Sequence, residues 1–234
     1  MKTGNVRERA VVLFSGGLDS TTVLAMATAA NLEVTALSFR YGQRHTLELQ
    51  KAEEAAKSYD VKEHIIIDLD PEPFRGSSLT GNIPLPKHRE NILRTIPSTY
   101  VPARNTVFLS IALGIAEARN ANHIFIGVNS LDYSGYPDCR PEYIDAFQKV
   151  ANLATKEAVE GTPPIIHAPL LYMTKAEIIK EGIELGVDYG KTLSCYQPNS
   201  RGESCGVCDA CILRLKGFKA NGLSDPAPYS SNEQ

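Results

Sequence analysis

A short glycine turn follows the first apolar segment of the chain. Residues 9–13 (RAVVL) are predicted to form a buried strand, and residues 14–20 (FSGGLDS) come directly after it. Two adjacent glycines let the backbone turn tightly and bring its N–H groups close to a ligand. Ser15 and Ser20 add hydroxyl groups at the positive end of the helix that follows. The pattern predicts a site for a polyanion, although Asp19 or Ser20 could instead simply cap the helix.

The turn lacks the lysine that follows the glycines of an ordinary P-loop and reaches the β- and γ-phosphates. It resembles instead the S-G-G-x-D-S loop of the PP-loop ATP pyrophosphatases, which bind the pyrophosphate of ATP while a substrate oxygen attacks the α-phosphorus. The resemblance therefore implies an adenylation reaction with ATP and Mg²⁺. The ATP-binding residues that it implies are Phe14, Ser15, Gly16, Gly17, Leu18, Asp19, Ser20, Thr21, Thr22, Val23 and Leu24.

Length and charge limit the classes of function. The chain has 234 residues, 43% of them hydrophobic and 22% charged, which is enough for one sizeable domain and an appendage. Its 24 lysines and arginines against 27 acidic residues give a net charge of −3, which argues against a large non-specific nucleic-acid footprint. The start of the chain is polar, and the first apolar run is far shorter than the roughly 18 residues that span a bilayer. We expect a cytoplasmic protein with a small-molecule substrate, no direct nucleic-acid binding and no membrane association.

Predicted strands and helices alternate along the chain. Further strands are predicted at residues 33–39, 64–67, 123–128 and 164–168. Helices are predicted around Val23, Leu24 and Ala27, along the apolar stripe Leu49, Ala52, Ala56 and Tyr59, and at residues 105–120 and 142–158. A last helix should begin at the capping box of residues 174–177 and end at Gly186. Alternation with short connections predicts an α/β fold with a doubly wound, Rossmann-like parallel sheet. The resemblance of the glycine turn implies that this fold is of the PP-loop type. Ligands of such folds bind at the carboxyl ends of the strands, where the glycine turn lies.

Residues 68–103 interrupt the alternation. They have no clear periodicity and contain six of the fourteen prolines, together with basic residues such as Arg89 and Arg94. Stretches this long inside a compact domain are usually lids, binding loops or disordered segments. We interpret the segment as a lid or a subunit contact, although its middle could equally be a solvated loop. Its end, residues 97–105, should enter a helix at the crevice.

Four of the five cysteines, Cys195, Cys205, Cys208 and Cys211, lie late in the chain. Four thiolates at this spacing can close a tetrahedral site, and the glycine after Cys205 permits the tight turn of a metal knuckle. Zinc is the favoured metal, although Cys-x-x-Cys-x-x-Cys runs also occur in iron–sulfur proteins. Because the protein supplies all four ligands, we predict one structural zinc ion per chain.

The cysteines also suggest how the chain is divided. We predict a nucleotide-binding α/β domain over residues 1–190, and a zinc-binding segment with a C-terminal helix and tail over residues 191–234. The fifth cysteine, Cys139, is isolated in a loop after a predicted strand. A buried structural role is the commoner case for such a residue, and a nucleophilic role stays an alternative.

Five motifs beside the glycine turn together resemble one family. They are YGQRH at residues 41–45, PSTYVPARN at 97–105, GVNSLDYSGYPDCRP at 127–141, TKAE at 174–177 and the four-cysteine tail. In order, spacing and total length they resemble the QueC family of 7-cyano-7-deazaguanine synthases over essentially residues 9–228. Departures are mild: Leu18 occupies the variable position of the turn, and Ala103 stands where glycine is expected before Arg-Asn.

The resemblance implies an ATP-dependent ligase that converts 7-carboxy-7-deazaguanine and ammonia to a nitrile, on the route to queuosine in tRNA. A carboxylate is a poor electrophile, so adenylation would supply a leaving group by forming an acyl-AMP and pyrophosphate. Ammonia would then give the amide, and a second activation, of the amide oxygen, would give the nitrile. The resemblance leaves open whether the products are AMP and pyrophosphate or ADP and phosphate. It also leaves open whether the protein is a homodimer.

The resemblance also implies residue roles. Asp19, Arg104 and Lys175 are the implied catalytic residues, with Asp19 facing the metal or capping its helix. Arg104 and Lys175 would place cations at the phosphates or the substrate carboxylate, although Lys175 could be merely a solvated first residue of its helix. The residues implied in reading the deazaguanine are Tyr41, Gln43, Arg104, Asp132, Tyr133, Asp138 and Arg140.

Two rival functions follow from the same residues. A tRNA sulfurtransferase of the PP-loop type would need a reactive cysteine pair near the crevice and usually an added RNA-binding module, neither of which is evident. A non-catalytic zinc-dependent binding module would use the four cysteines to present a recognition helix. The set of ATP-site segments argues against that second alternative.

Overall fold

A parallel sheet forms the centre of the computed structural model, which describes residues 7–44, 47–88, 96–131 and 135–230. Its five strands have the order β3-β2-β1-β4-β5, and every neighbouring pair is parallel. The strands are β1 (Arg9–Leu13), β2 (Glu33–Arg40), β3 (Val61–Asp68), β4 (His123–Phe125) and β5 (Ile165–His167). The predicted α/β class with a doubly wound parallel sheet is confirmed.

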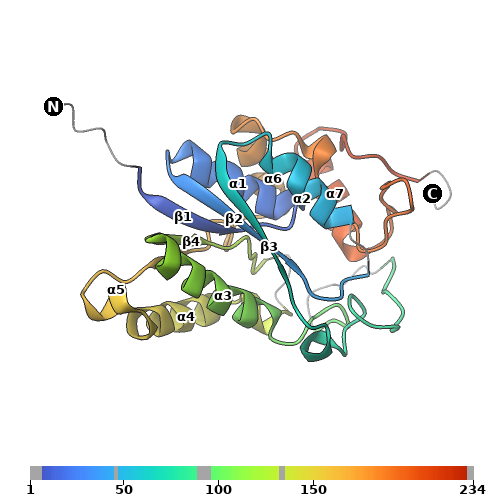
Figure 1. The fold of residues 1–234 in the computed structure, drawn as a ribbon. Coiled ribbons are helices and arrows are strands. Elements are labelled where there is room, and N and C mark those ends of the chain that lie inside the picture. The colour runs from blue at the N-terminus through green and yellow to red at the C-terminus, as the bar shows by residue number, and fades with distance from the viewer. Residues whose placement is uncertain (1–6, 45–46, 89–95, 132–134, 231–234) are drawn as a thin grey trace.

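Helices cover both faces of this sheet (Figure 1). One face carries α1 (Leu18–Ala29), α2 (Leu47–Ala56), α6 (Lys175–Glu184) and α7 (Asp209–Ala220). The opposite face carries α3 (Arg104–Arg119), α4 (Pro141–Ala154) and the short α5 (Lys156–Val159). Within the described ranges, no helix has both the length and the apolar character that crossing a bilayer requires.

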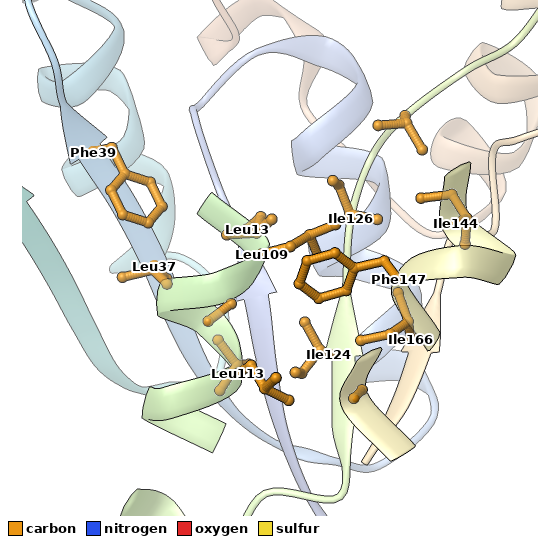
Figure 2. Packing of buried hydrophobic residues seen from close by; sticks show 14 of the residues in the cluster. Leu13, Leu37, Phe39, Leu109, Leu113, Ile124, Ile126, Ile144, Phe147 and Ile166 are labelled. Carbon is orange, nitrogen blue, oxygen red and sulfur yellow. The ribbon is translucent and has the colours of Figure 1, made fainter. Parts of the chain in front are cut away.

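The central strand β1 is apolar on both sides because it lies between two helical layers. Val11 and Leu13 pack in one buried cluster with α3 and α4, while Ala10 and Val12 pack in the other with α1 and α6. Side chains alternate between the two faces of a strand, so a strand that helices cover on both faces needs an uninterrupted run of apolar residues. Figure 2 shows the first cluster, in which Leu109 and Leu113 of α3 and Phe147 of α4 meet side chains from the strands of the sheet.

Several element boundaries differ from the predicted ones. Strand β3 begins three residues earlier than predicted, at Val61, and β4 ends at Phe125 rather than residue 128. The predicted helix over 142–158 is two helices, because the Thr155 hydroxyl accepts a bond from Ala158 N at 3.2 Å and starts α5 afresh. The predicted capping box at Thr174 is confirmed, with both of its reciprocal bonds present.

The described parts of residues 68–103 are anchored to the domain. Phe74, in a short 3-10 turn (Glu72–Phe74), is buried in the cluster beside α3. Ser78 N donates to Ser98 O at 2.7 Å, and His88 N donates to Val207 O at 3.0 Å, close to the cysteine knuckle. Arg89 and Arg94 lie outside the described residues. The role of this segment as a lid or a subunit contact stays a prediction.

Ala103, which stands where the family resemblance led us to expect glycine, has a left-handed backbone. It is the residue before α3, with φ 48° and ψ 25°. Left-handed backbone costs an alanine roughly 1–2 kcal/mol, whereas glycine adopts it freely. Glycine would therefore fit the backbone conformation of position 103 better than the alanine that is present.

We expect Ala103→Gly to raise the free energy of unfolding by up to about 1 kcal/mol, because the relief of strain exceeds the entropy lost by glycine. Urea denaturation measures the change. Ala118→Gly, at an exposed position in the last turn of the same helix, is the matched control and should lower stability by up to about 1 kcal/mol. Equal losses in both variants would contradict the prediction.

Candidate active site

A cavity of about 260 Å³ lies at the carboxyl ends of β1, β2 and β4. The glycine turn forms one end of it, and Tyr41, Arg104 and Tyr136 belong to the other residues that line it. This position matches the expected crevice, because the strands of a parallel sheet release their following loops at the same edge. Loops that are far apart in the sequence therefore meet around one volume.

Gly16 allows helix α2 to pack directly against the turn. It has φ +80°, and a Cβ atom there would lie 2.7 Å from Ala52 N and 2.9 Å from Glu48 O. Both contacts are with backbone, which cannot move aside as a flexible side chain can. Glycine is therefore required at this position both for its conformation and for its size.

Hydroxyl groups of the turn hold its shape. Ser15 Oγ lies 3.1 Å from Ser20 Oγ, and Ser15 N donates to Ser20 Oγ at 3.2 Å. Helix α1 begins at Leu18 with Gly17 as its N-cap residue, so its positive end faces the cavity. Backbone N–H groups at such a helix start can bind an anion, and a phosphate ligand at this turn stays a prediction.

Asp19 and Lys175 form an ion pair at the edge of the turn. Lys175 Nζ donates to Asp19 Oδ1 at 2.6 Å, and only 8% of the lysine side chain is exposed. Lys175 is thus not a solvated first residue of α6, which was the alternative. Burial of a lysine without a partner would cost several kcal/mol, so the aspartate stabilises the cation inside the cavity wall.

The remaining predicted ATP-binding residues lie behind the turn. Among the described residues, the lining of the cavity includes Phe14, Ser15, Gly17, Leu18, Asp19 and Ser20 but not Gly16 or residues 21–24. Thr22, Val23 and Leu24 are fully buried in α1, and the Thr22 hydroxyl lies 2.7 Å from Tyr189 Oη. These residues support the turn from the core.

Arg104 lines the same cavity from the first turn of α3, close to Tyr41. Burial alone would lower the pKa of its guanidinium, but the nearby Tyr41 and Asp138 raise it well above its usual value. Arg104 therefore supplies a fixed positive charge in a partly enclosed site. Tyr41 packs edge-on against Phe108, with ring centroids 5.2 Å apart, and both rings line the cavity.

Three other residues predicted to read the substrate already have protein partners. Gln43 Oε1 accepts from Tyr41 N at 2.8 Å, so this side chain holds the loop after β2 although it also lines the cavity. Asp138 accepts from Asn105 N at 3.0 Å and fixes the start of α3. Arg140 Nε donates to Pro137 O at 3.2 Å. Asp132 and Tyr133, also predicted, lie outside the described residues.

Cys139 lines the cavity but is a poor candidate for a nucleophile. Burial, together with the charge of Asp138, raises the pKa of its thiol to about 12. The thiolate, not the thiol, is the reactive form. Asn105 Nδ2 contacts the sulfur at 3.4 Å, which agrees with a packing role.

Sequence reasoning missed several residues of the cavity. Glu48, Ser194 and Tyr196 line it, and they come from α2 and from the segment before the cysteine knuckle. Glu48 follows the YGQRH motif by three residues and occupies the polar side of a helix whose apolar stripe was recognised. Nothing in its spacing marked it, because only the tertiary structure brings α2 to the turn.

The four late cysteines gather as predicted. Their Sγ atoms all lie within 4.8 Å of one another, which suits a four-coordinate metal with Zn–S bonds of about 2.3 Å. Cys195 Sγ also accepts bonds from Gln197 N and Cys205 N, both at 3.3 Å. Such N–H donors stabilise the thiolate form that binds metal. The donor set therefore fits a closed zinc site.

This cysteine cluster is joined to the glycine turn through residues 193–195. Leu193 N donates to Gly16 O at 3.1 Å, and the Ser194 hydroxyl accepts from Leu18 N at 3.2 Å. Ser194 thus satisfies an unpaired N–H group at the start of α1. The next residue in the chain, Cys195, belongs to the cluster. A metal ion there would hold a wall of the cavity in place.

The family described as "Queuosine biosynthesis protein QueC" matches residues 9–222, which is most of the chain. The chain belongs to the QueC family. It is 60% identical to a 7-cyano-7-deazaguanine synthase from Magnetococcus marinus, over 94% of this chain and 96% of that protein. A 7-cyano-7-deazaguanine synthase from Syntrophotalea carbinolica is 59% identical, over 97% and 99%. The family resemblance inferred from the motifs is confirmed.

Solved structures similar to this QueC-family protein share its fold. An NMN synthetase from Francisella tularensis aligns with a TM-score of 0.51 at 18% identity, over 97% of this chain and 81% of that one. A 4-thiouridine synthetase in complex with RNA and ATP aligns with a TM-score of 0.54 at 16% identity, over 95% of this chain and 47% of that one. At such low identity the likeness concerns the fold alone.

We expect metal removal from this QueC-family protein to weaken ATP binding by at least about tenfold, which is 1.4 kcal/mol. The reason is that residues 193–195 lose their anchor beside the turn. Calorimetric titration with ATP before and after chelation measures the effect, and elemental analysis should give one zinc per chain. Zinc added back should restore binding. Unchanged ATP affinity in the metal-free, folded protein would contradict the prediction.

Proposed function

We propose that this protein converts 7-carboxy-7-deazaguanine and ammonia to 7-cyano-7-deazaguanine with ATP, as a QueC-family synthase in queuosine biosynthesis. The observation that carries the proposal is one cavity lined both by a phosphate-type turn with a buried ion pair and by Arg104 with aromatic rings, which would be the two functional ends of the site. An enzyme that adenylates a carboxylate needs both ends at once, because the substrate oxygen must reach the α-phosphorus.

At the first end, the turn would hold the pyrophosphate of ATP. Ser15, Gly17 and the N-terminus of α1 present hydroxyl and N–H groups, and Lys175 adds a positive charge. Asp19 would bind Mg²⁺, since carboxylate oxygens are preferred ligands of this ion. Electrostatic stabilisation of the leaving pyrophosphate is the main catalytic effect of these groups.

At the second end, Arg104 would orient the substrate carboxylate. Its fixed charge and planar guanidinium suit a carboxylate that must present one oxygen to the phosphorus. The rings of Tyr41 and Phe108 offer apolar faces against which the flat deazaguanine can stack. Gln43, Asp138 and Arg140 would act through the loops that they hold.

Zinc would have a structural role in this scheme. All four ligands come from the protein, so the site leaves no position for a substrate. Three of the four cysteines are buried. The ion would stabilise the fold around the cavity and take no part in the chemistry.

We expect Lys175→Met to lower kcat/KM for nitrile formation by about 10²–10³-fold, because the variant keeps the aliphatic stem and removes the charge at the pyrophosphate. Binding of 7-carboxy-7-deazaguanine alone should change less than about threefold, which fluorescence or calorimetry can measure. Lys180→Met, at an exposed position on the same helix, is the matched control and should retain full activity. Equal losses in both variants would remove Lys175 from the proposed site.

The function itself is tested by turnover. The protein, with zinc bound, is incubated with ATP, Mg²⁺, an ammonium salt and 7-carboxy-7-deazaguanine, and mass spectrometry resolves bases and nucleotides. Nitrile together with AMP is the expected result. Nitrile with ADP would keep the function and reject adenylation, while free amide that is never consumed would reject the two-step scheme. Absence of any turnover would overturn the proposal and direct the search to tRNA sulfur transfer.

A further inference from the structure

Glu48 brings a carboxylate into the cavity, close to Arg104. It lies in the first turn of α2 and lines the cavity, and its side chain is partly buried. Its carbonyl oxygen would be only 2.9 Å from a Cβ atom at Gly16, which places the backbone of this residue against the glycine turn. Because Gly16 permits this approach, the backbone of Glu48 lies against the turn, while its carboxylate lies close to Arg104.

Arg104 is the cation whose charge acts on the Glu48 carboxylate. Arg104 from α3 faces Glu48 closely enough to favour its ionised form, and Tyr41 from the end of β2 lies beside both. Arg44, which also lines the cavity, donates to Gly81 O at 2.8 Å and so holds the long segment. Burial outweighs the charge of Arg104 and raises the pKa of Glu48 to about 7.

Glu48 differs from the other carboxylates of the site. Among the described residues that line the cavity, Asp19 and Glu48 are the two carboxylates. Asp19 is bonded to Lys175 at 2.6 Å and is expected to bind the magnesium ion. Asp138, outside the lining, accepts from Asn105 N at 3.0 Å. Glu48 differs from both: it faces the cavity next to Arg104, and among the described residues it neither pairs with a lysine nor binds the start of α3.

The proposed reaction releases protons from nitrogen. Attack of ammonia on the acyl-AMP forms a C–N bond, expels AMP with the electron pair of the C–O bond and leaves an N–H proton to be removed. Adenylation of the amide oxygen by a second ATP releases pyrophosphate and one N–H proton. In the last step an N–H bond breaks, its electron pair completes the C≡N bond, and AMP leaves with the oxygen. A base beside the reacting carbon is needed each time.

We propose that Glu48 is the general base that takes these N–H protons, in the amidation and again in formation of the nitrile. The inference rests on the proposed function. Arg104 holds the carboxyl carbon of the substrate, so a carboxylate facing Arg104 is next to the nitrogen that joins this carbon. An ionised Glu48 accepts a proton at each step and returns it to solvent before the next. A base whose affinity for protons matches neutral pH combines the required protonation state with sufficient driving force.

The test separates the first half of the reaction from the rest. Exchange of labelled pyrophosphate into ATP, with 7-carboxy-7-deazaguanine and without ammonia, reports adenylation alone, which needs no base at nitrogen. Steady-state nitrile formation with saturating ammonia reports the later steps. Both are measured for the wild-type protein, for Glu48→Gln and for Glu54→Gln, an exposed residue on the same helix. If the wild-type protein neither exchanges nor forms nitrile, the proposed function fails, whatever Glu48 does.

For Glu48→Gln we expect exchange within about threefold of wild type and nitrile formation lowered by about 10²–10⁴-fold. The acidic limb of the wild-type kcat profile, near pH 7, should also disappear, and Glu54→Gln should match wild type in every assay. Loss of both pyrophosphate exchange and nitrile formation would overturn the proposal. A rise in KM for 7-carboxy-7-deazaguanine at constant kcat would also overturn it. The second of these results would make Glu48 a residue that reads the deazaguanine edge.

Stability checks that the variant still folds. The raised pKa of Glu48 means that its ionisation destabilises the folded state as pH rises from about 4.5 to 7, so glutamine should be nearly neutral at pH 4 and stabilising at pH 8. Glu48→Asp keeps a carboxylate and should keep the acidic limb at a lower rate. If neither variant folds, the dependence of the wild-type kcat on pH tests the proposal by itself. A kcat that does not fall below about pH 7 would overturn it.

Discussion

The close approach of two segments to one glycine is the constraint on which this structure depends. At Gly16, helix α2 contacts the turn, and Leu193 N bonds to the carbonyl oxygen of the same glycine. The turn is therefore clamped between a helix near the start of the chain and the segment that leads to the cysteines. A phosphate-type turn can act only when its N–H groups are held in place before the ligand arrives, because ordering them later would cost binding energy.

Two buried cations of this framework, Lys175 and Arg214, are each paired with an aspartate. Lys175 is bonded to Asp19 at the cavity, and Arg214 of α7 is bonded to Asp225 at 2.6 Å, with at most 3% of either side chain exposed. Arg214 also donates to Thr192 Oγ1 at 2.7 Å, which connects the C-terminal tail to the residue before Leu193. Removal of one partner from such a pair leaves an uncompensated buried charge, so these contacts specify the arrangement of the wall. The predicted division of the chain at residue 190 stays a prediction, and Phe218 of α7 packs in the same cluster as α1.

The sequence predicted the fold class well because alternating apolar strands and amphipathic helices admit few architectures. It was less successful at boundaries and at contacts between distant elements. Thr155 interrupts a helix that periodicity alone joined, because its hydroxyl competes for a backbone N–H group. Lys175 has the sequence signature of an exposed first helical residue, and only Asp19 explains its burial. No sequence pattern marked Glu48 as a residue of the cavity, because its neighbours Gly16 and Arg104 are remote in the chain.

By itself the sequence determined the parallel α/β architecture, the glycine turn, the clustering of four cysteines and membership of the QueC family, because each depends on local pattern or on long motifs. The tertiary structure decided which polar groups face the cavity. It assigned Asp138 to the start of α3, paired Lys175 with Asp19 and placed Glu48 beside Arg104. Such assignments depend on packing between elements far apart in the chain, and no local spacing encodes that packing.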